Sequence, residues 1–135
     1  MKQTSRRKFI ATAASAGIAV AVSAKPLTMK EKNKQVAHHA LFWLKNPTSA
    51  EDRDKLVEGV KGLAKIEAIK QIHVGVLAST EKREVVDTSW QVSEIMFFDS
   101  LDGQATYQTH PIHQDFIKNY GHLWEKVVVY DAMEA

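Results

Sequence analysis

The chain has no cysteine among its 135 residues. This absence excludes a disulfide framework, a thiolate zinc site, a cysteine nucleophile and a lipid anchor on an N-terminal cysteine. A domain without disulfides must take its stability from its hydrophobic core. With about 110 residues after an N-terminal targeting segment, one domain buries only a marginal fraction of its surface, so dimerisation would help to stabilise it.

A hydrophobic run long enough for a comfortable membrane span is also missing. The apolar, alanine-rich run 10–22 follows the twin-arginine pattern Ser5–Ile10 and leads into a small-residue cleavage site at Val22–Ala24. This order is typical of a signal peptide. We therefore predict that residues 1–24 are a twin-arginine signal peptide, which sends the folded protein to the periplasm or out of a bacterial cell. An uncleaved N-terminal anchor and the ordinary secretory route are the alternatives.

An excess of positive charge is absent after this segment. The full chain has 18 Lys and Arg against 16 Asp and Glu. Four of the bases and none of the acids lie in residues 1–24, so the remaining chain carries 14 bases and 16 acids, a net charge of −2. No basic patch therefore argues for nucleic acid as a partner. We also expect no stable membrane insertion once the signal is cleaved.

The apolar pattern beyond a lysine-rich leader at residues 25–35 predicts one domain, residues 36–133. Alternation with period two indicates strands, and spacing of three and four residues indicates helices. The predicted strands are Val36–Lys45, Ile69–Ala78, Ser89–Phe98 and Glu125–Met133, and the predicted helices run from Thr48 to about Ile66, from Leu101 to Tyr107 and from Pro111 to about Tyr120.

The order β-α-β-β-α-β predicts an α+β, ferredoxin-like fold with an antiparallel sheet. Thr48 followed by Glu51 predicts a capping box at the start of the first helix. The helices should cover one sheet face. The other face is also largely apolar, so it requires a partner, and two such sheets packed face to face would bury it.

The segment Tyr107–His113 carries a phenol and two imidazoles. Pro111 disfavours a helical conformation at His110 and suits the first turn of a new helix. One interpretation is acid–base chemistry, in which the phenol of Tyr107 holds a substrate carbonyl and His113 removes a proton alpha to it. The other is that His110, Pro111 and His113 only fix the corner between two helices.

Two polar residues interrupt the predicted inner faces of the strands. Alternation puts His38 on one face with Phe42, and Glu94 on one face with Met96. A carboxylate in an apolar interior is costly unless it is paired or protonated. Glu94 is therefore functional, paired with a nearby histidine, or close to the rim.

A metal site is a weaker hypothesis. His110 and His113, with His38 and Glu94, could ligate a metal, but the spacing is loose, and we predict none. The other histidines, His39, His73 and His122, are expected to be surface or partly buried residues.

Three stretches carry a resemblance to a known family. The first strand has a histidine seven residues before a lysine, at His38 and Lys45. The segment Tyr107–Phe116 and the last strand, Trp124–Asp131, are the other two. From Val36 to about Met133 the chain resembles the stress-responsive A/B barrel domain proteins. The resemblance implies a homodimer whose two sheets form a dimeric α/β barrel with an interior.

One plant member of this family is a polyketide cyclase that uses no metal and no organic cofactor. Its catalytic tyrosine and histidine correspond to Tyr107 and His113, and a first-strand pocket histidine corresponds to His38. A third-strand pocket histidine corresponds to Val92, and an apolar cavity position corresponds to Glu94. The first of these departures argues against the same cyclase activity here.

Two hypotheses follow. The first is an exported homodimer that binds a small apolar or aromatic ligand, or acts as a stability protein, without turnover. The second is a cofactor-free cyclase, lyase or isomerase that acts alpha to a carbonyl. A closed cavity shared by Tyr107 and His113 would favour the enzyme, whereas a His113 that faces solvent or caps a backbone group would argue against it. The expected catalytic residues are Tyr107 and His113, and the expected pocket residues are His38, Phe42, Glu94, Met96 and His110, with no cofactor and no metal.

Overall fold

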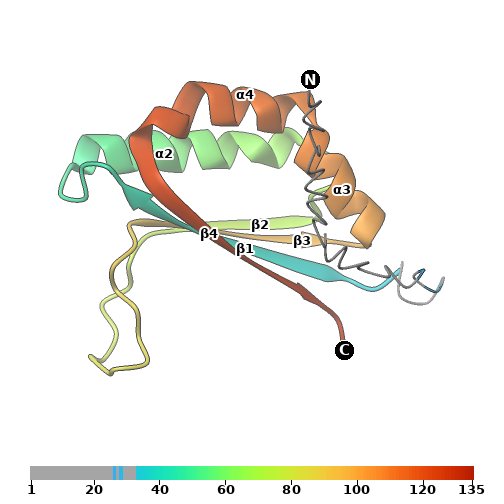
Figure 1. Cartoon of the computed structure of the whole chain (residues 1–135), viewed down its shortest axis with the longest axis horizontal. Helices are drawn as coiled ribbons and strands as arrows, with labels where there is room; N and C mark the ends of the chain where they lie inside the picture. The colour runs from blue at the N-terminus through green and yellow to red at the C-terminus, as the bar shows by residue number, and fades with distance from the viewer. Residues whose placement is uncertain (1–25, 27, 29–32) are drawn as a thin grey trace, which may run out of the picture.

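A computed structural model describes residues 26, 28 and 33–135 of the chain (Figure 1). The predicted signal peptide and most of the predicted leader lie outside these residues. Within the described part, no helix is both long and apolar enough to cross a membrane.

The described residues form a four-stranded sheet covered by helices on one face. The strands are β1 (Val36–Leu44), β2 (Gln71–Gly75), β3 (Val92–Phe98) and β4 (Trp124–Met133), the helices are α2 (Ala50–Gly62), α3 (Leu101–Thr109) and α4 (Pro111–Tyr120), and the 3₁₀ turns are η1 (Leu63–Lys65) and η2 (Gly121–Leu123). The strand order is β2-β3-β1-β4, and all neighbouring strands pair antiparallel. This confirms the predicted ferredoxin-like α+β fold.

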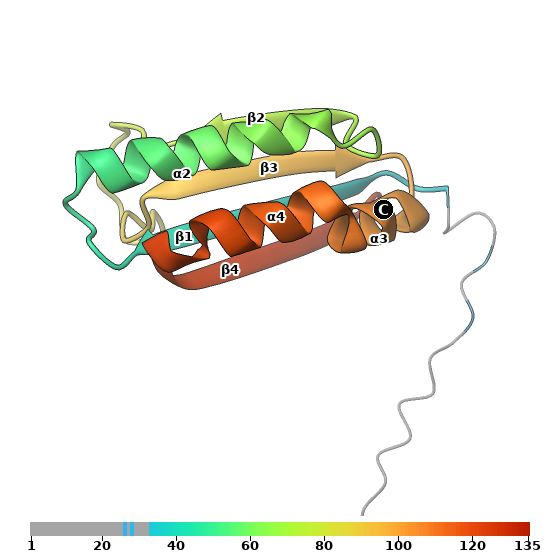
Figure 2. The ribbon, with the colours of Figure 1, turned by 90° about the horizontal axis from the view of Figure 1, so that it is seen from above.

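The helices form one layer above the sheet. Seen from the helical side, α2 runs along β2 and β3, and α4 runs along β1 and β4 (Figure 2). The short helix α3 lies at one end, where it is joined to α4 by a sharp corner.

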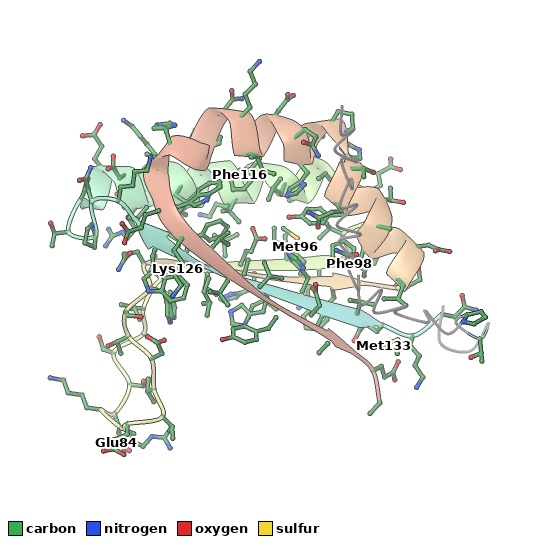
Figure 3. The ribbon with its side chains drawn as sticks, in the orientation of Figure 1. Glu84, Met96, Phe98, Phe116, Lys126 and Met133 are labelled. Atoms are coloured by element: carbon green, nitrogen blue, oxygen red, sulfur yellow. The ribbon has the colours of Figure 1, made fainter. Side chains whose placement is uncertain are left out.

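The alternation of side chains along β1 explains why this strand lies in the middle of the sheet. Its side chains are alternately buried and half-buried from Val36 to Leu44. The buried set faces the helices, where α2 contributes Leu56 and Val60 at helical spacing. Both of these α2 side chains have no exposed surface. Full burial of one such side chain is worth about 1.5–3 kcal/mol. Met96 and Phe98 of β3 lie in the same layer (Figure 3).

The start of α2 corrects a prediction. Ser49, not Thr48, is the N-cap, because its side-chain oxygen accepts a hydrogen bond from the backbone N–H of Asp52 at 3.1 Å. Thr48 lies inside a tight turn, which the Ser49 N–H closes by donating to the carbonyl of Asn46 at 3.0 Å. The predicted capping box at Thr48 and Glu51 is therefore wrong by one residue. The predicted end near Ile66 holds, because η1 continues the helix to Lys65.

The second and third strands are shorter than predicted. β2 pairs only from Gln71 to Gly75, and β3 begins at Val92 rather than Ser89. The chain between them, residues 76–91, leaves the sheet and extends away from the helices as an arm, with Glu84 near its tip (Figures 1 and 3). The predicted second strand was too long, because the apolar alternation continues to Ala78 although strand pairing ends at Gly75.

The face of the sheet away from the helices carries apolar and aromatic side chains on β1, β3 and β4. We call it the open face, and define it by the residues between the buried ones of β1 and by the β3 and β4 residues paired with them. These are Ala37, His39, Leu41, Trp43, Ser93, Ile95, Phe97, Lys126, Val128, Tyr130 and Ala132.

Two glycines of α2 allow a matched test of helix packing. A Cβ atom on Gly59 would lie 2.8 Å from three ring carbons of Tyr120, whereas one on Gly62 would meet nothing within 4 Å. We expect Gly59→Ala to lower the free energy of unfolding by about 1–3 kcal/mol, because the ring must move. Gly62→Ala should raise it by about 0.5–1 kcal/mol, because alanine is the better helix former. Urea denaturation measures both, and equal effects of the two changes would contradict this packing.

Candidate functional site

The corner between α3 and α4 is a single residue, His110. It ends α3 and caps α4 with an extended backbone, φ −64° and ψ 138°. Its Nδ1 accepts a hydrogen bond from the N–H of Ile112 at 3.1 Å, and Pro111 occupies the first helical position. The corner therefore holds Tyr107, in the last turn of α3, and His113, in the first turn of α4, in a fixed relation.

A cavity of about 350 Å³ lies between these helices and the strands β1, β3 and β4. Its walls are aromatic and aliphatic, with polar groups gathered toward the corner. The lining residues are His38, Ala40, Phe42, Glu94, Tyr107, Gln108, His113, Phe116, Ile117, Trp124, Val127, Val129 and Asp131. The cavity is built within one chain on the helical side of the sheet, not between two sheets as the family resemblance implied. It is partly open along β4, where Val127 and Val129 stay exposed.

His38 links two carboxylates. Its Nδ1 lies 2.6 Å from Oδ1 of Asp131, and its Nε2 lies 3.6 Å from Oε1 of Glu94. Burial lowers the pKa of His38, but hydrogen bonds with Glu94 and Asp131 and their negative charges outweigh it, so the pKa lies above 6.5. The two carboxylates therefore shift the protonation equilibrium of His38 toward the imidazolium, compared with a free histidine.

The same Glu94 oxygen meets the phenol of Tyr107. The hydroxyl donates to Oε1 of Glu94 at 3.5 Å, which is long for a bond of this type. Burial, together with the charge of Glu94, raises the pKa of Tyr107 far above its usual 10.0, so the phenol stays protonated. Tyr107 can therefore donate a hydrogen bond but cannot act as a phenolate near neutral pH.

His113 lines the cavity and also binds the backbone. The side chain is buried, and its Nδ1 lies 3.0 Å from the carbonyl oxygen of Gln108. A carbonyl only accepts, so Nδ1 carries the hydrogen, and Nε2 of the neutral ring keeps a lone pair. The ring thus binds a backbone group, which was the outcome counted against the enzyme, and it also lines a cavity that is partly open rather than closed.

The structure brings most of the predicted site residues together. His38, Phe42, Glu94, Tyr107 and His113 line the cavity. Two predicted pocket residues, Met96 and His110, do not line the cavity. Met96 is fully buried in the core, and His110 uses its ring to cap α4.

Sequence reasoning missed Asp131 and most of the wall on β4. The antiparallel pairing of β1 with β4 puts Asp131 directly opposite His38. An acid closing the apolar run of the last strand was the available signal, but the register that pairs it with His38 cannot be read from either strand alone. Among the described residues, no group of three or more His, Asp and Glu side chains is placed to hold a metal ion.

The fold and the whole domain match a known family. The model of the stress-responsive A/B barrel domain matches residues 36–134. The chain belongs to this family. No curated protein matches the sequence.

Solved structures share the fold. A dimeric protein of unknown function with a ferredoxin-like fold, from Bacteroides fragilis, is 26% identical, with a TM-score of 0.59, over 74% of this chain and 96% of its own. A protein of Arabidopsis thaliana is 27% identical, with a TM-score of 0.62, over 74% of this chain and 95% of its own. The hydroxynitrile lyase of Passiflora edulis is 18% identical, with a TM-score of 0.63, over 76% of this chain and 95% of its own.

The raised pKa of His38 is directly measurable. In a proton NMR titration, His38 should titrate above pH 6.5, and Asp131→Asn should lower its midpoint. His39 is an internal control in the same spectra, since burial lowers its pKa below 6.5. A His38 midpoint that Asp131→Asn leaves unchanged would contradict the arrangement.

The same shift makes stability depend on pH. A pKa raised by folding adds stability that is present below pH 6.5 and is lost as the pH rises through the folded-state pKa. Asp131→Asn should therefore lower the free energy of unfolding more at pH 6 than at pH 9. Because Asp131 is half exposed and solvent screens the pair, the loss at pH 6 should be about 0.5–1 kcal/mol.

Proposed function

We propose that the protein is a homodimer that binds a small apolar or aromatic molecule in the cavity of each chain. The observation that carries the proposal is the convergence of four polar side chains at one end of a cavity of about 350 Å³ with aromatic walls. Such volumes and linings are typical of small-molecule sites. The four are His38, Glu94, Tyr107 and His113.

The walls support an apolar ligand body. Phe42, Phe116 and Trp124 pack ring against ring, with centroid separations of 5.1 to 6.4 Å. This packing holds the three rings in place before any ligand arrives, so little side-chain freedom would be lost on binding. Phe116 comes from α4 (Figure 3), and the other two come from the sheet side.

A second candidate function is acid–base chemistry without a cofactor. It is favoured by the hydrogen bond from His113 to the Gln108 carbonyl, which leaves Nε2 as the basic nitrogen. In the proposed step, Nε2 takes a proton from the carbon next to a carbonyl, and the electron pair of the C–H bond moves onto the carbonyl oxygen as an enolate. Tyr107 would donate its hydroxyl hydrogen bond to that oxygen, and its long bond to Glu94 is easily exchanged. A neighbour of the same fold is a lyase.

Dimerisation and export complete the proposal. The open face exposes apolar and aromatic side chains that another copy would cover, and the Bacteroides fragilis neighbour is described as dimeric.

Export rests on the twin-arginine pattern at Ser5–Ile10. Replacing Arg6 and Arg7 by lysine should keep the chain in the bacterial cytoplasm, as cell fractionation would show.

Ligand binding is tested by blocking the cavity. Val129 lines it and is 44% exposed, so Val129→Trp can fill the mouth without disturbing the core. We expect small aromatic compounds that raise the melting temperature of the wild type to lose at least about tenfold in affinity for this variant. Val85→Trp, on the arm at 83% exposure, is the matched control and should bind as the wild type does. Equal binding by all three proteins would place the ligand elsewhere.

Catalysis has a separate readout. If a bound compound has an acidic C–H next to a carbonyl, the wild type should exchange that hydrogen with deuterated solvent, and His113→Ala should slow the exchange by about 10²–10⁴-fold. If the compound binds but its hydrogen exchanges no faster than in buffer, catalysis is refuted, and ligand binding without turnover remains as the function.

The dimer is tested on two adjacent residues of β4. Val128 is on the open face, opposite Leu41, whereas Val127 lines the cavity. Val128→Glu should convert a dimer into a monomer in light scattering, because it would bury an unpaired charge between two copies. Val127→Glu should leave the dimer intact. A wild-type monomer, or a dimer that survives Val128→Glu, would exclude this interface.

A further inference from the structure

Glu94 occupies a position that the fold would normally give to an apolar residue. It lies on β3, with β1 on one side and β2 on the other, opposite Ala40 and Val74. Its neighbours on the same strand face, Val92 and Met96, have no exposed surface, and Glu94 itself is 2% exposed. A carboxylate is costly in such a place, so its retention calls for an interaction that an apolar residue could not make.

The partners within the chain use only one of its two oxygens. Oε1 faces both Tyr107 and His38, at 3.5 Å and 3.6 Å. Oε2 is buried and has no hydrogen-bond partner in the described part of the chain. An ionised carboxylate accepts at both oxygens, and a buried acceptor without a donor is rare. Glu94 also lines the cavity, so a ligand there is within reach of this carboxyl group.

Two acidic side chains, Glu94 and Asp131, line the cavity, and both face the same basic side chain, His38. None of the described residues that line the cavity is a lysine or an arginine. Asp131 is half exposed and can be solvated, whereas Glu94 is buried. The acidic group that lacks a partner for one oxygen is therefore the buried one.

We propose that the cavity selects a small apolar molecule that carries a protonated amine, and that Glu94 is the residue that determines this specificity. The ammonium group would donate to the free carboxylate oxygen, while the apolar body would pack against Phe42, Phe116 and Trp124. Aromatic faces also attract a nearby cation, which adds to the preference over a neutral ligand. Because Glu94 is already desolvated, the ligand would relieve a cost that the protein bears in its absence. This inference rests on the proposed ligand-binding function and adds the ligand class to it.

A series of probes with one ring and different head groups tests the proposal. Benzylamine, benzyl alcohol and benzoate present an ammonium, a hydroxyl and a carboxylate to the same cavity, and calorimetry or ligand-observed NMR gives their affinities for the whole protein. We expect benzylamine to bind the wild type at least tenfold more tightly than benzyl alcohol, and benzoate to bind least tightly.

Two variants assign the preference to one residue. Glu94→Gln removes the charge and should bring benzylamine down to the affinity of benzyl alcohol, while benzyl alcohol itself still binds. Glu67→Gln makes the same change of charge on the surface and should keep the wild-type order. An amine preference that survives Glu94→Gln would overturn the assignment.

The affinities of the wild type alone test the ligand class and the binding function, even if Glu94→Gln does not fold. Equal affinities of benzylamine and benzyl alcohol would refute the ligand class and leave the binding function standing. If no probe of the series binds, the ligand-binding function fails together with this inference.

Discussion

The apolar layer between the sheet and the helices is the constraint on which the whole structure depends. β1 lies in the middle of the sheet and presents every second side chain to that layer, where α2 and α4 cover it. The site lies in the part of this layer near the corner of α3 and α4, where polar side chains replace apolar ones. Each of these groups needs a partner in a place with little water, so their contacts with one another follow from the packing around them.

The backbone conformation at His110 and Pro111 fixes the geometry of the site. Proline fixes the backbone at the start of α4, and the His110 ring satisfies an N–H of its first turn. Tyr107 and His113 are therefore held from opposite sides of one rigid joint, with ring centroids 4.4 Å apart. His110 makes the corner, and Tyr107 and His113 on either side of it line the cavity, while acid–base chemistry by this pair stays a prediction.

Much of the fold followed from local pattern, and the site followed only in part. Alternation placed His38 and Glu94 on buried faces of β1 and β3, and the proline placed the helix boundary. Alternation could not say which side of the sheet the helices take, because both faces of β1 carry apolar residues, so the cavity was expected between two sheets. Asp131 was missed because its meeting with His38 depends on the register of two strands that lie far apart in the sequence. Met96 shares its strand face with Glu94 but sits deeper, which alternation alone does not distinguish.

The cavity is lined by residues of one chain, and this has a consequence for how a homodimer would fill it. Each copy would carry its own site on the outer, helical side of its sheet, with both sheets between the two sites. Stoichiometry would be one ligand per chain, and the first ligand would leave the second site unchanged unless the sheets themselves shifted. A binding curve without cooperativity is therefore the natural behaviour of this architecture, in contrast to a barrel whose single interior is shared by both copies.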